Sequence, residues 1–355
     1  VQISETDTPL HRLETVYRRL NEHLATTDTP QGALRSIIDG WFYTLEQDVL
    51  AEGGQSAQDH AALVVRTNDL MEQRLLGVTR TAPMLAAALR GYRQALQSGH
   101  SHIAEGLVAW IAGQPNVAAS VKRAAAVKGD IDHFAALSFL QGLLVILRDS
   151  GYSGLVLVLD EVETLQRVRS DVREKGLNAL RQLLDEVDAG RFPGLYLLVT
   201  GTAGFFDGPQ GVQRLPPLAQ RLHVDFTTDA RFDNPRAVQI RLPAFTRERL
   251  QEVGRKVRDI YATHAGNGAR LRAIVDDEYV ATLADAVAGK LGGKVGIVPR
   301  LFLKKLVADV LDRVDLHDDF DPRRHYALTL SDAEMTPVER SATGASSVDD
   351  IELPS

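Results

Sequence analysis

Two carboxylates, Asp160 and Glu161, directly follow an uninterrupted run of branched apolar residues, Leu155–Leu159. Such a run predicts a strand that is buried on both faces inside a parallel sheet, with the two carboxylates at its carboxyl edge. Open α/β sheets bind their ligands at this edge. One carboxylate there can hold Mg²⁺, and the next can polarise a water molecule for attack on a phosphate. The alternative is a buried strand that simply ends in an acidic turn.

An apolar strand ending in Asp-Glu is the Walker B pattern of P-loop ATPases, in which Asp160 would hold Mg²⁺ through water and Glu161 would activate the attacking water. The Walker A sequence G-x-x-x-x-G-K-[ST], which cradles the phosphates, occurs nowhere in the 355 residues. Either the first strand and loop of the domain precede Val1, or the protein is a degenerate ATPase. The strand-like opening at residues 1–4, which begins with Val rather than Met, favours truncation.

A second apolar run covers residues 195–200, and a helix with an apolar stripe over residues 177–187 separates it from the first. The order strand, helix, strand predicts a parallel pair with a right-handed crossover. Thr200 and Thr202 then reach the same sheet edge as Asp160, where a hydroxyl can orient a water molecule or sense a γ-phosphate. The alternative is a threonine that only ends a strand.

Three arginines are candidates for contacts with phosphate. Arg221, or else Arg214, flanks a proline-initiated helix and could act on the nucleotide of a neighbouring subunit as an arginine finger. Arg300 lies in the first turn of a predicted helix, where the helix dipole disfavours a cation, so it requires a negative partner. A nucleotide phosphate would serve, as for the sensor-2 arginine of AAA+ lids. A salt bridge to a nearby carboxylate is the alternative for all three.

The remaining pattern predicts an α/β P-loop NTPase fold, with a parallel sheet, a large helical insertion and a C-terminal helical lid. The predicted core, which lacks the Walker A strand and loop, covers residues 1–242 and includes the insertion at about 30–150 and a short strand at 238–242. The predicted lid covers residues 243–330, and a disordered tail rich in Ser, Thr and Asp follows at 331–355. Individual helices are expected at 13–24, 30–50, 131–148, 246–264, 276–290 and 299–314.

The composition excludes several classes of protein. The chain has no cysteine, so disulfides, thiolate metal sites and cysteine nucleophiles are ruled out. No apolar run is long enough to span a bilayer and no signal peptide is visible, which predicts a cytoplasmic protein with no membrane partner. The net charge of −7 argues against a general nucleic-acid coat. The ten histidines do not follow metal-ligand spacing, and no G-x-S-x-G elbow occurs.

With these residues in view, the chain resembles the AAA+ ATP-binding proteins of BREX-type phage-resistance systems (the BrxC/BrxD-like P-loop family), which are related to replication-initiator and STAND ATPases. The resemblance covers most of residues 1–314. It is carried by Thr8-Pro9-Leu10-His11-Arg12 with Tyr17, by residues 157–165 and 198–202 with Phe205-Phe206, by residues 218–222, and by Val298-Pro299-Arg300. In that family a Walker A loop precedes the opening strand, so its absence here is expected to reflect a lost N-terminus.

The resemblance implies a component that binds ATP and Mg²⁺, and that couples ATP hydrolysis to the remodelling of a partner assembly. Its expected partners are other subunits of a homo- or hetero-oligomeric ATPase and proteins of a phage-defence complex, with any contact to DNA being indirect. Without the Walker A loop this chain alone is expected to be inactive. The alternative is a non-hydrolysing, ATPase-like scaffold whose helical region docks other proteins.

Overall fold

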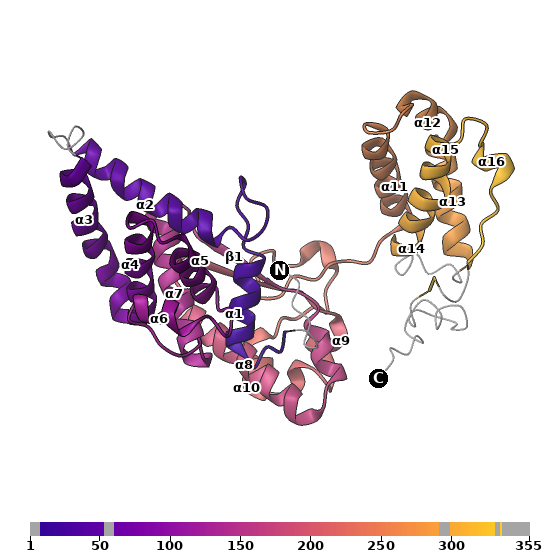
Figure 1. Ribbon diagram of the computed structural model, residues 1–355. Helices are drawn as coiled ribbons and strands as arrows, with labels where there is room; N and C mark the ends of the chain where they lie inside the picture. Colours follow the sequence, from indigo (N-terminus) through magenta and orange to yellow (C-terminus); the bar gives the residue numbers. More distant parts are fainter. Residues whose placement is uncertain (1–7, 53–59, 291–298, 331–333, 336–355) are drawn as a thin grey trace. The chain divides into compact units, whose positions relative to one another are not determined.

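The computed structural model describes residues 8–52, 60–290, 299–330 and 334–335. The strand-like opening at 1–4, a glycine-rich stretch at 292–296 that the sequence suggests as a turn, and all of the predicted tail at 331–355 except residues 334–335 lie outside the described residues. The chain divides into two compact units, residues 1–223 and 224–355, each with its own hydrophobic core (Figure 1). None of the described helices combines the length and the apolar character needed to cross a membrane.

Helices dominate the first unit, in agreement with the helical pattern of the sequence. Helix α7 (His133–Asp149) contacts α1, α2 and α3, and it leads directly into the first strand (Figure 1). Aromatic residues fill the centre, where the ring of Phe139 meets those of Tyr17 and Trp110 edge-on. The other helices before the sheet are α1 (Leu13–Glu22), α2 (Leu34–Ala51), α3 (His60–Thr81), α4 (Pro83–Gln97), α5 (Ser101–Ile111) and α6 (Ala119–Ala124).

Two details of the helical prediction are wrong. Helix α2 begins at Leu34 rather than at Pro30, because Gly32 adopts a left-handed backbone with φ of 64° that an α-helix cannot contain. A helix beginning at Pro30 would have Thr29 as its N-cap, but the Thr29 hydroxyl lies 3.3 Å from that of Ser36 instead. Phe134 belongs to a helix that is apolar on most sides, which predicts burial, but its side chain is 77% exposed in the first turn of α7.

The two apolar runs form β1 (Leu155–Leu159) and β2 (Leu195–Val199), which pair in parallel with Leu155 opposite Leu195 and Leu159 opposite Val199. This confirms the predicted parallel pairing, and α8 (Ser170–Asp188) provides the crossover. The prediction that the first strand is buried on both faces of the sheet is wrong. Leu157 is 2% exposed, whereas Val156 and Tyr196 on the opposite face are 61% and 65% exposed, since the described helices cover only one face.

The chain after β2 departs from the prediction. Short helices follow at α9 (Ala203–Asp207) and α10 (Pro216–Leu222), but residues 238–242 form no strand. Arg241 explains the difference, because its guanidinium binds the carboxylate of Asp233 and the carbonyls of Phe226 and Thr228, which folds this stretch into a loop. Two strands are therefore described, and the larger P-loop sheet is not seen in the described part of the chain.

The second unit is helical, as predicted for residues beyond 243. The predicted helix over 299–314 is interrupted, however, because α14 (Pro299–Lys304) passes into a π-helix (Lys305–Leu311) before α15 (Asp312–Leu316). The spacing of Leu303, Val307, Val310 and Val314 predicts one continuous α-helical face that includes Arg300. The π-helical turns, with i→i+5 hydrogen bonds, break that 3.6-residue period. The other helices of this unit are α11 (Arg247–Ala262), α12 (Gly268–Ile274), α13 (Asp277–Lys290) and α16 (Pro322–His325).

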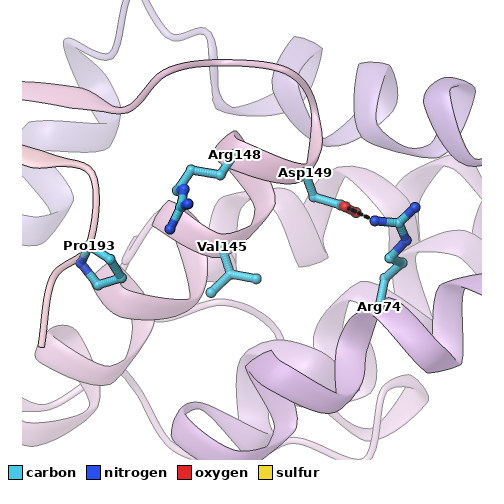
Figure 2. Close-up of a pocket in the computed structure, with 5 residues that line it drawn as sticks. All are labelled: Arg74, Val145, Arg148, Asp149 and Pro193. Carbon is cyan, nitrogen blue, oxygen red and sulfur yellow. Dashed lines mark hydrogen bonds and ion pairs between the residues drawn. The ribbon is translucent and has the colours of Figure 1, made fainter.

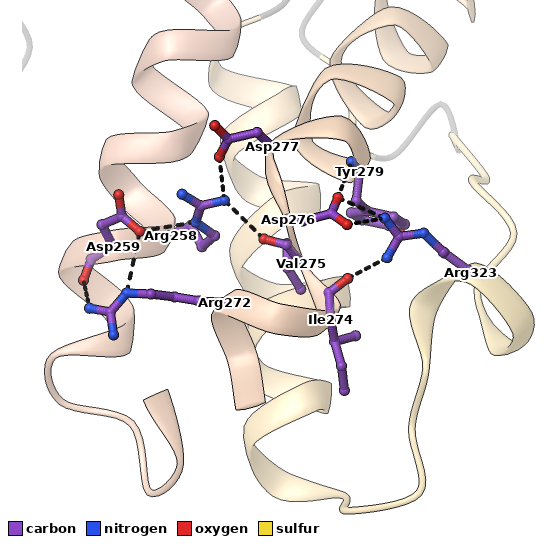
Figure 3. Close-up of polar contacts among 9 residues, drawn as sticks. All are labelled: Arg258, Asp259, Arg272, Ile274, Val275, Asp276, Asp277, Tyr279 and Arg323. Carbon is purple, nitrogen blue, oxygen red and sulfur yellow. Dashed lines mark hydrogen bonds and ion pairs between the residues drawn. The ribbon is translucent and has the colours of Figure 1, made fainter. Parts of the chain in front are cut away.

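Polar contacts, one of them made by a buried arginine, tie these helices together (Figure 3). Arg258 is only 8% exposed on α11, and its guanidinium donates to the carboxylate of Asp277 at 2.7 Å and to the carbonyl of Val275 at 3.1 Å. Arg323, from α16, donates to both carboxylate oxygens of Asp276 at 2.7 Å. Because a buried guanidinium is stable only when its hydrogen bonds are satisfied, Arg258 fixes the turn between α12 and α13 relative to α11.

Replacing Arg258 with methionine is expected to destabilise the second unit by about 1–3 kcal/mol, because the buried carbonyl of Val275 loses its donor. Hydrogen–deuterium exchange of α11 and α13 measures this change. The control is Lys256→Met on the same helix, where the side chain is 74% exposed and its ion pair with Glu252 contributes at most about 1 kcal/mol. Equal protection of α11 and α13 from exchange in Arg258→Met and Lys256→Met would contradict this role of Arg258.

The same variant is expected to change the response of the second unit to acid. The hydrogen bond from Arg258 holds the pKa of Asp259 below its ordinary value. A carboxylate with a lowered folded-state pKa stabilises the fold above its unfolded pKa of about 4 and loses that contribution as pH falls. Wild type and Arg258→Met should therefore differ most in the protection of α11 and α13 from hydrogen–deuterium exchange near neutral pH. This difference in protection should become smaller below about pH 4. A difference that grows in acid would refute this linkage.

Candidate functional site

The carboxyl edge of the strand pair brings Asp160 and Thr200 together. The register places the two residues side by side, one position beyond Leu159 and Val199, and the Thr200 hydroxyl donates directly to Oδ1 of Asp160. The backbone continues the pairing, since Thr200 N–H donates to the Leu159 carbonyl at 2.9 Å. A carboxylate and a hydroxyl thus share one corner of the sheet edge, as expected from the parallel pairing.

At this edge of the sheet, Glu161 has an unusual backbone conformation. Its φ of 54° and ψ of 43° lie in the left-handed region, which a residue other than glycine adopts at a cost. Its N–H donates to Oδ1 of Asp160 at 3.0 Å and lies 3.4 Å from the Thr200 hydroxyl oxygen. The left-handed turn leaves the Glu161 side chain exposed beside Asp160. Such local strain is typical of functional positions.

The turn after Glu161 is held by contacts that the sequence did not reveal. The charged run that follows Glu161, residues 163–173, predicts a loop, but a 3₁₀ helix (Val162–Arg167) covers much of it. Thr164 donates from its hydroxyl to the Glu161 carbonyl at 2.8 Å. Arg173, on the first turns of α8, donates to the carbonyls of Leu165, Gln166 and Val168. No motif distinguishes Arg173 from the neighbouring arginines, so only the folded structure identifies it as a positioning residue.

Thr202 lies at the same edge but apart from the Asp160–Thr200 contact. It is the exposed residue before α9, and its carbonyl accepts from the N–H of Phe205 at 3.0 Å. Of the two predicted threonines, Thr200 is therefore the one that the structure brings into hydrogen-bond contact with Asp160.

The two candidate finger arginines have different surroundings. Arg221, on α10, forms ion pairs with Asp185 and Asp188 of α8. Arg214 is exposed at the end of the 3₁₀ helix Val212–Arg214. A role for Arg221 in a neighbouring subunit would require these ion pairs to break, and the choice between the two arginines stays a prediction.

Arg300 belongs to the second unit, where its Nη2 donates to the main-chain carbonyl of Glu334 at 2.8 Å. The neighbouring Lys305 binds the carboxylate of the same glutamate at 2.7 Å. One partner of Arg300 within the chain is thus a main-chain carbonyl.

A pocket of about 340 Å³ lies at the other end of the strands (Figure 2). It is lined by Arg74, Val145, Arg148, Asp149 and Pro193, of which Pro193 precedes β2. Asp149 is already engaged, because it accepts from Arg74 at 2.6 Å and from the Trp41 indole at 2.6 Å. Since ligands of α/β sheets bind at carboxyl ends, this pocket does not compete with the Asp160 edge as a nucleotide site.

The donor atoms at the Asp160 edge suit a hard cation. Mg²⁺ prefers oxygen ligands and commonly takes one or two carboxylates together with waters and substrate phosphates. Asp160 and Thr200 supply a carboxylate and a hydroxyl. Among the described residues, no group of three or more His, Cys, Asp or Glu could hold a metal by itself. The edge thus fits a metal that arrives with its phosphate ligand rather than a closed metal centre.

A parallel strand pair carries a carboxylate, a hydroxyl and a left-handed glutamate at its carboxyl edge, which is the edge at which α/β sheets commonly bind ligands. Comparison with family models gives a match over residues 1–330 to the BREX system ATP-binding proteins BrxC/D. The chain therefore belongs to this family of ATP-binding proteins of a phage-defence system, which confirms the resemblance seen in the sequence. No curated protein and no solved structure matches it.

The left-handed backbone at Glu161 predicts an inverted preference between glycine and alanine. Glu161→Gly should make the first unit more stable than Glu161→Ala by about 1 kcal/mol, because only glycine adopts this backbone without a Cβ clash. Both tryptophans, Trp41 and Trp110, lie in this unit, so urea unfolding followed by tryptophan fluorescence reports on it alone.

The matched control is Glu174, an exposed residue within α8. There, Glu174→Gly should be less stable than Glu174→Ala by about 0.5–1 kcal/mol, since glycine weakens a helix interior. The same order of stability at both positions would show that Glu161 carries no backbone strain.

Proposed function

We propose that this chain contributes the Walker B edge of an AAA+-type P-loop ATPase, which couples MgATP hydrolysis to the remodelling of a partner assembly in phage defence. The observation that carries the proposal is the contact between Asp160 and Thr200 across two parallel strands, with Glu161 exposed beside it. Family membership supports ATP as the nucleotide.

Each residue of the edge has a distinct part in this proposal. Asp160 would hold Mg²⁺ through water, and the metal would supply charge neutralisation at the phosphates. Glu161 would accept a proton from the attacking water, and its side chain is open to solvent. Thr200 fixes the carboxylate of Asp160 by donating to it, which also orients its own oxygen for a water molecule.

The remaining predicted residues complete the proposal. Thr202 would be a second γ-phosphate sensor, Arg221 a finger that acts in trans, and Arg300 the arginine through which the lid senses the nucleotide. Other subunits of an oligomeric ATPase and proteins of the defence complex would be the partners, with DNA contacted only indirectly.

A non-hydrolysing scaffold is the second candidate. It is favoured by the absence of G-x-x-x-x-G-K-[ST] from the printed sequence, because a chain without this loop has no known cradle for the β- and γ-phosphates. In that case the helices α2–α7 would serve as the docking region. The two candidates differ in whether Glu161 matters for turnover.

Replacing Glu161 with glutamine is expected to lower ATP turnover by at least about 100-fold while leaving ATP affinity unchanged, because glutamine keeps the shape but cannot accept the proton. Turnover is measured by phosphate release and binding by calorimetry, both in the protein that includes any Walker A segment encoded upstream. Glu174→Gln, on the exposed face of α8, is the control and should behave as wild type. Full turnover in Glu161→Gln would refute the ATPase proposal and favour the scaffold.

A further inference from the structure

The 3₁₀ helix that follows Glu161 is tied to the end of β2 and to the segment after it. Its first residue, Val162, donates from its N–H to the Thr200 carbonyl at 3.2 Å. Near its other end, Nε2 of Gln166 donates to the carbonyl of Gly204, in α9, at 2.9 Å. The turn that carries Glu161 is therefore attached to both turns of the proposed site.

Arg173 holds the same 3₁₀ helix from the side of α8. Its Nε donates to the carbonyl of Leu165 at 3.2 Å, and its Nη2 donates to the carbonyls of Gln166 and Val168 at 2.8 and 3.0 Å. Its Nη1 donates to the side-chain oxygen of Gln210, in the segment after α9. Since the last carbonyls of a helix have no partner within that helix, Arg173 supplies the donors that this end lacks.

The charge of Arg173 does not serve an ion pair. In the part of the chain that the structure describes, its guanidinium binds neutral oxygens and no carboxylate, whereas Arg191 and Arg221 of the same unit bind carboxylates. A planar guanidinium presents its donors in a fixed fork, but the ammonium of lysine is a point charge on a flexible stem. The contacts of Arg173 therefore indicate a geometric role.

These contacts bear on the backbone of Glu161. A left-handed residue other than glycine persists only where the surrounding structure requires that conformation. The bond of Val162 to β2 fixes the start of the 3₁₀ helix, and Arg173 fixes its end. The middle packs closely on α8, because a Cβ on Gly176 would lie 2.4 Å from Cδ2 of Leu165. With the helix held at these points, the chain has to turn sharply at Glu161, whose φ is 54°.

We propose that Arg173 is the positioning residue of Glu161. Its guanidinium fork keeps the 3₁₀ helix closed, and the closed helix keeps Glu161 in its left-handed turn. Through Gln210 the same fork connects this turn to the segment after β2, which carries Thr202. The effect on the backbone requires no ligand. That the position of Glu161 serves to activate a water molecule rests on the function proposed above.

The first test measures the coupling between Arg173 and the backbone of Glu161. Urea unfolding followed by tryptophan fluorescence gives the difference in midpoint between Glu161→Gly and Glu161→Ala, in wild type and in Arg173→Met. We expect Arg173→Met to reduce this difference at least about twofold, because an open turn lets alanine leave the left-handed region. Lys175→Met is the control, since Lys175 is exposed on the same helix, and it should leave the difference unchanged.

A residue that only stabilises the unit would lower both midpoints equally, so an unchanged difference in Arg173→Met would overturn the proposal. The absence of any glycine advantage in wild type would also overturn it. Arg173→Lys is the second variant, which keeps the charge without the fork and serves if Arg173→Met does not fold. Its midpoint difference should be smaller than that of wild type. The full wild-type difference in Arg173→Lys would refute the role of the fork.

The second test measures turnover, in the protein that includes any Walker A segment encoded upstream. Arg173→Met should lower kcat by about tenfold or more with the KM for ATP unchanged, because a displaced base affects the chemical step. Combined with Glu161→Gln, it should cause no further loss, since Arg173 acts through Glu161. A further loss of about tenfold in the double variant would overturn the positioning role. Full turnover in Glu161→Gln would refute the ATPase proposal alone, because the midpoint difference does not depend on ATP.

Discussion

The register between β1 and β2 is the constraint on which the candidate site depends. Leu159 opposite Val199 sets Asp160 beside Thr200, and a shift by one residue would turn their side chains to opposite faces. The start of the pair is fixed by a close approach of two glycines. A Cβ on Gly154 would lie 2.0 Å from the carbonyl oxygen of Gly194, which accepts from Leu155 N–H at 2.8 Å. Backbone contact at one end of the strands therefore determines which side chains meet at the other.

Features that depend on local pattern could be predicted from the sequence. The two apolar runs specify the strands, the stripe over residues 177–187 specifies the crossover helix, and together they imply a shared edge for Asp160 and Thr200. Features that depend on contacts with residues far away in the sequence could not be predicted. Nothing in the apolar run around Val156 shows that only one face of the sheet is covered. Residues 238–242 have the pattern of a strand, but Arg241 holds them in a loop. Its partners there are Phe226, Thr228 and Asp233.

The strained backbone at Glu161 connects the fold to the proposed chemistry. Val162 N–H donates to the Thr200 carbonyl at 3.2 Å, so the chain keeps contact with β2 while it turns into the 3₁₀ helix. That contact requires a sharp turn at one residue, and Glu161 takes it in the left-handed conformation. The energetic cost of the left-handed backbone thus falls on the residue whose side chain, in the proposed function, lies beside Asp160 without a hydrogen bond to it. A glycine would make the turn more easily but would remove the carboxylate.

Arginines that sequence reasoning assigns to phosphate are bound inside the chain, and this affects how any nucleotide could engage them. Arg221 is paired with two aspartates of α8, and Arg300 donates to the carbonyl of Glu334. An exposed ion pair contributes at most about 1 kcal/mol, so a phosphate that carries several negative charges can replace it at small cost. The Glu334 contact is harder to break, because Lys305 is buried and depends on it.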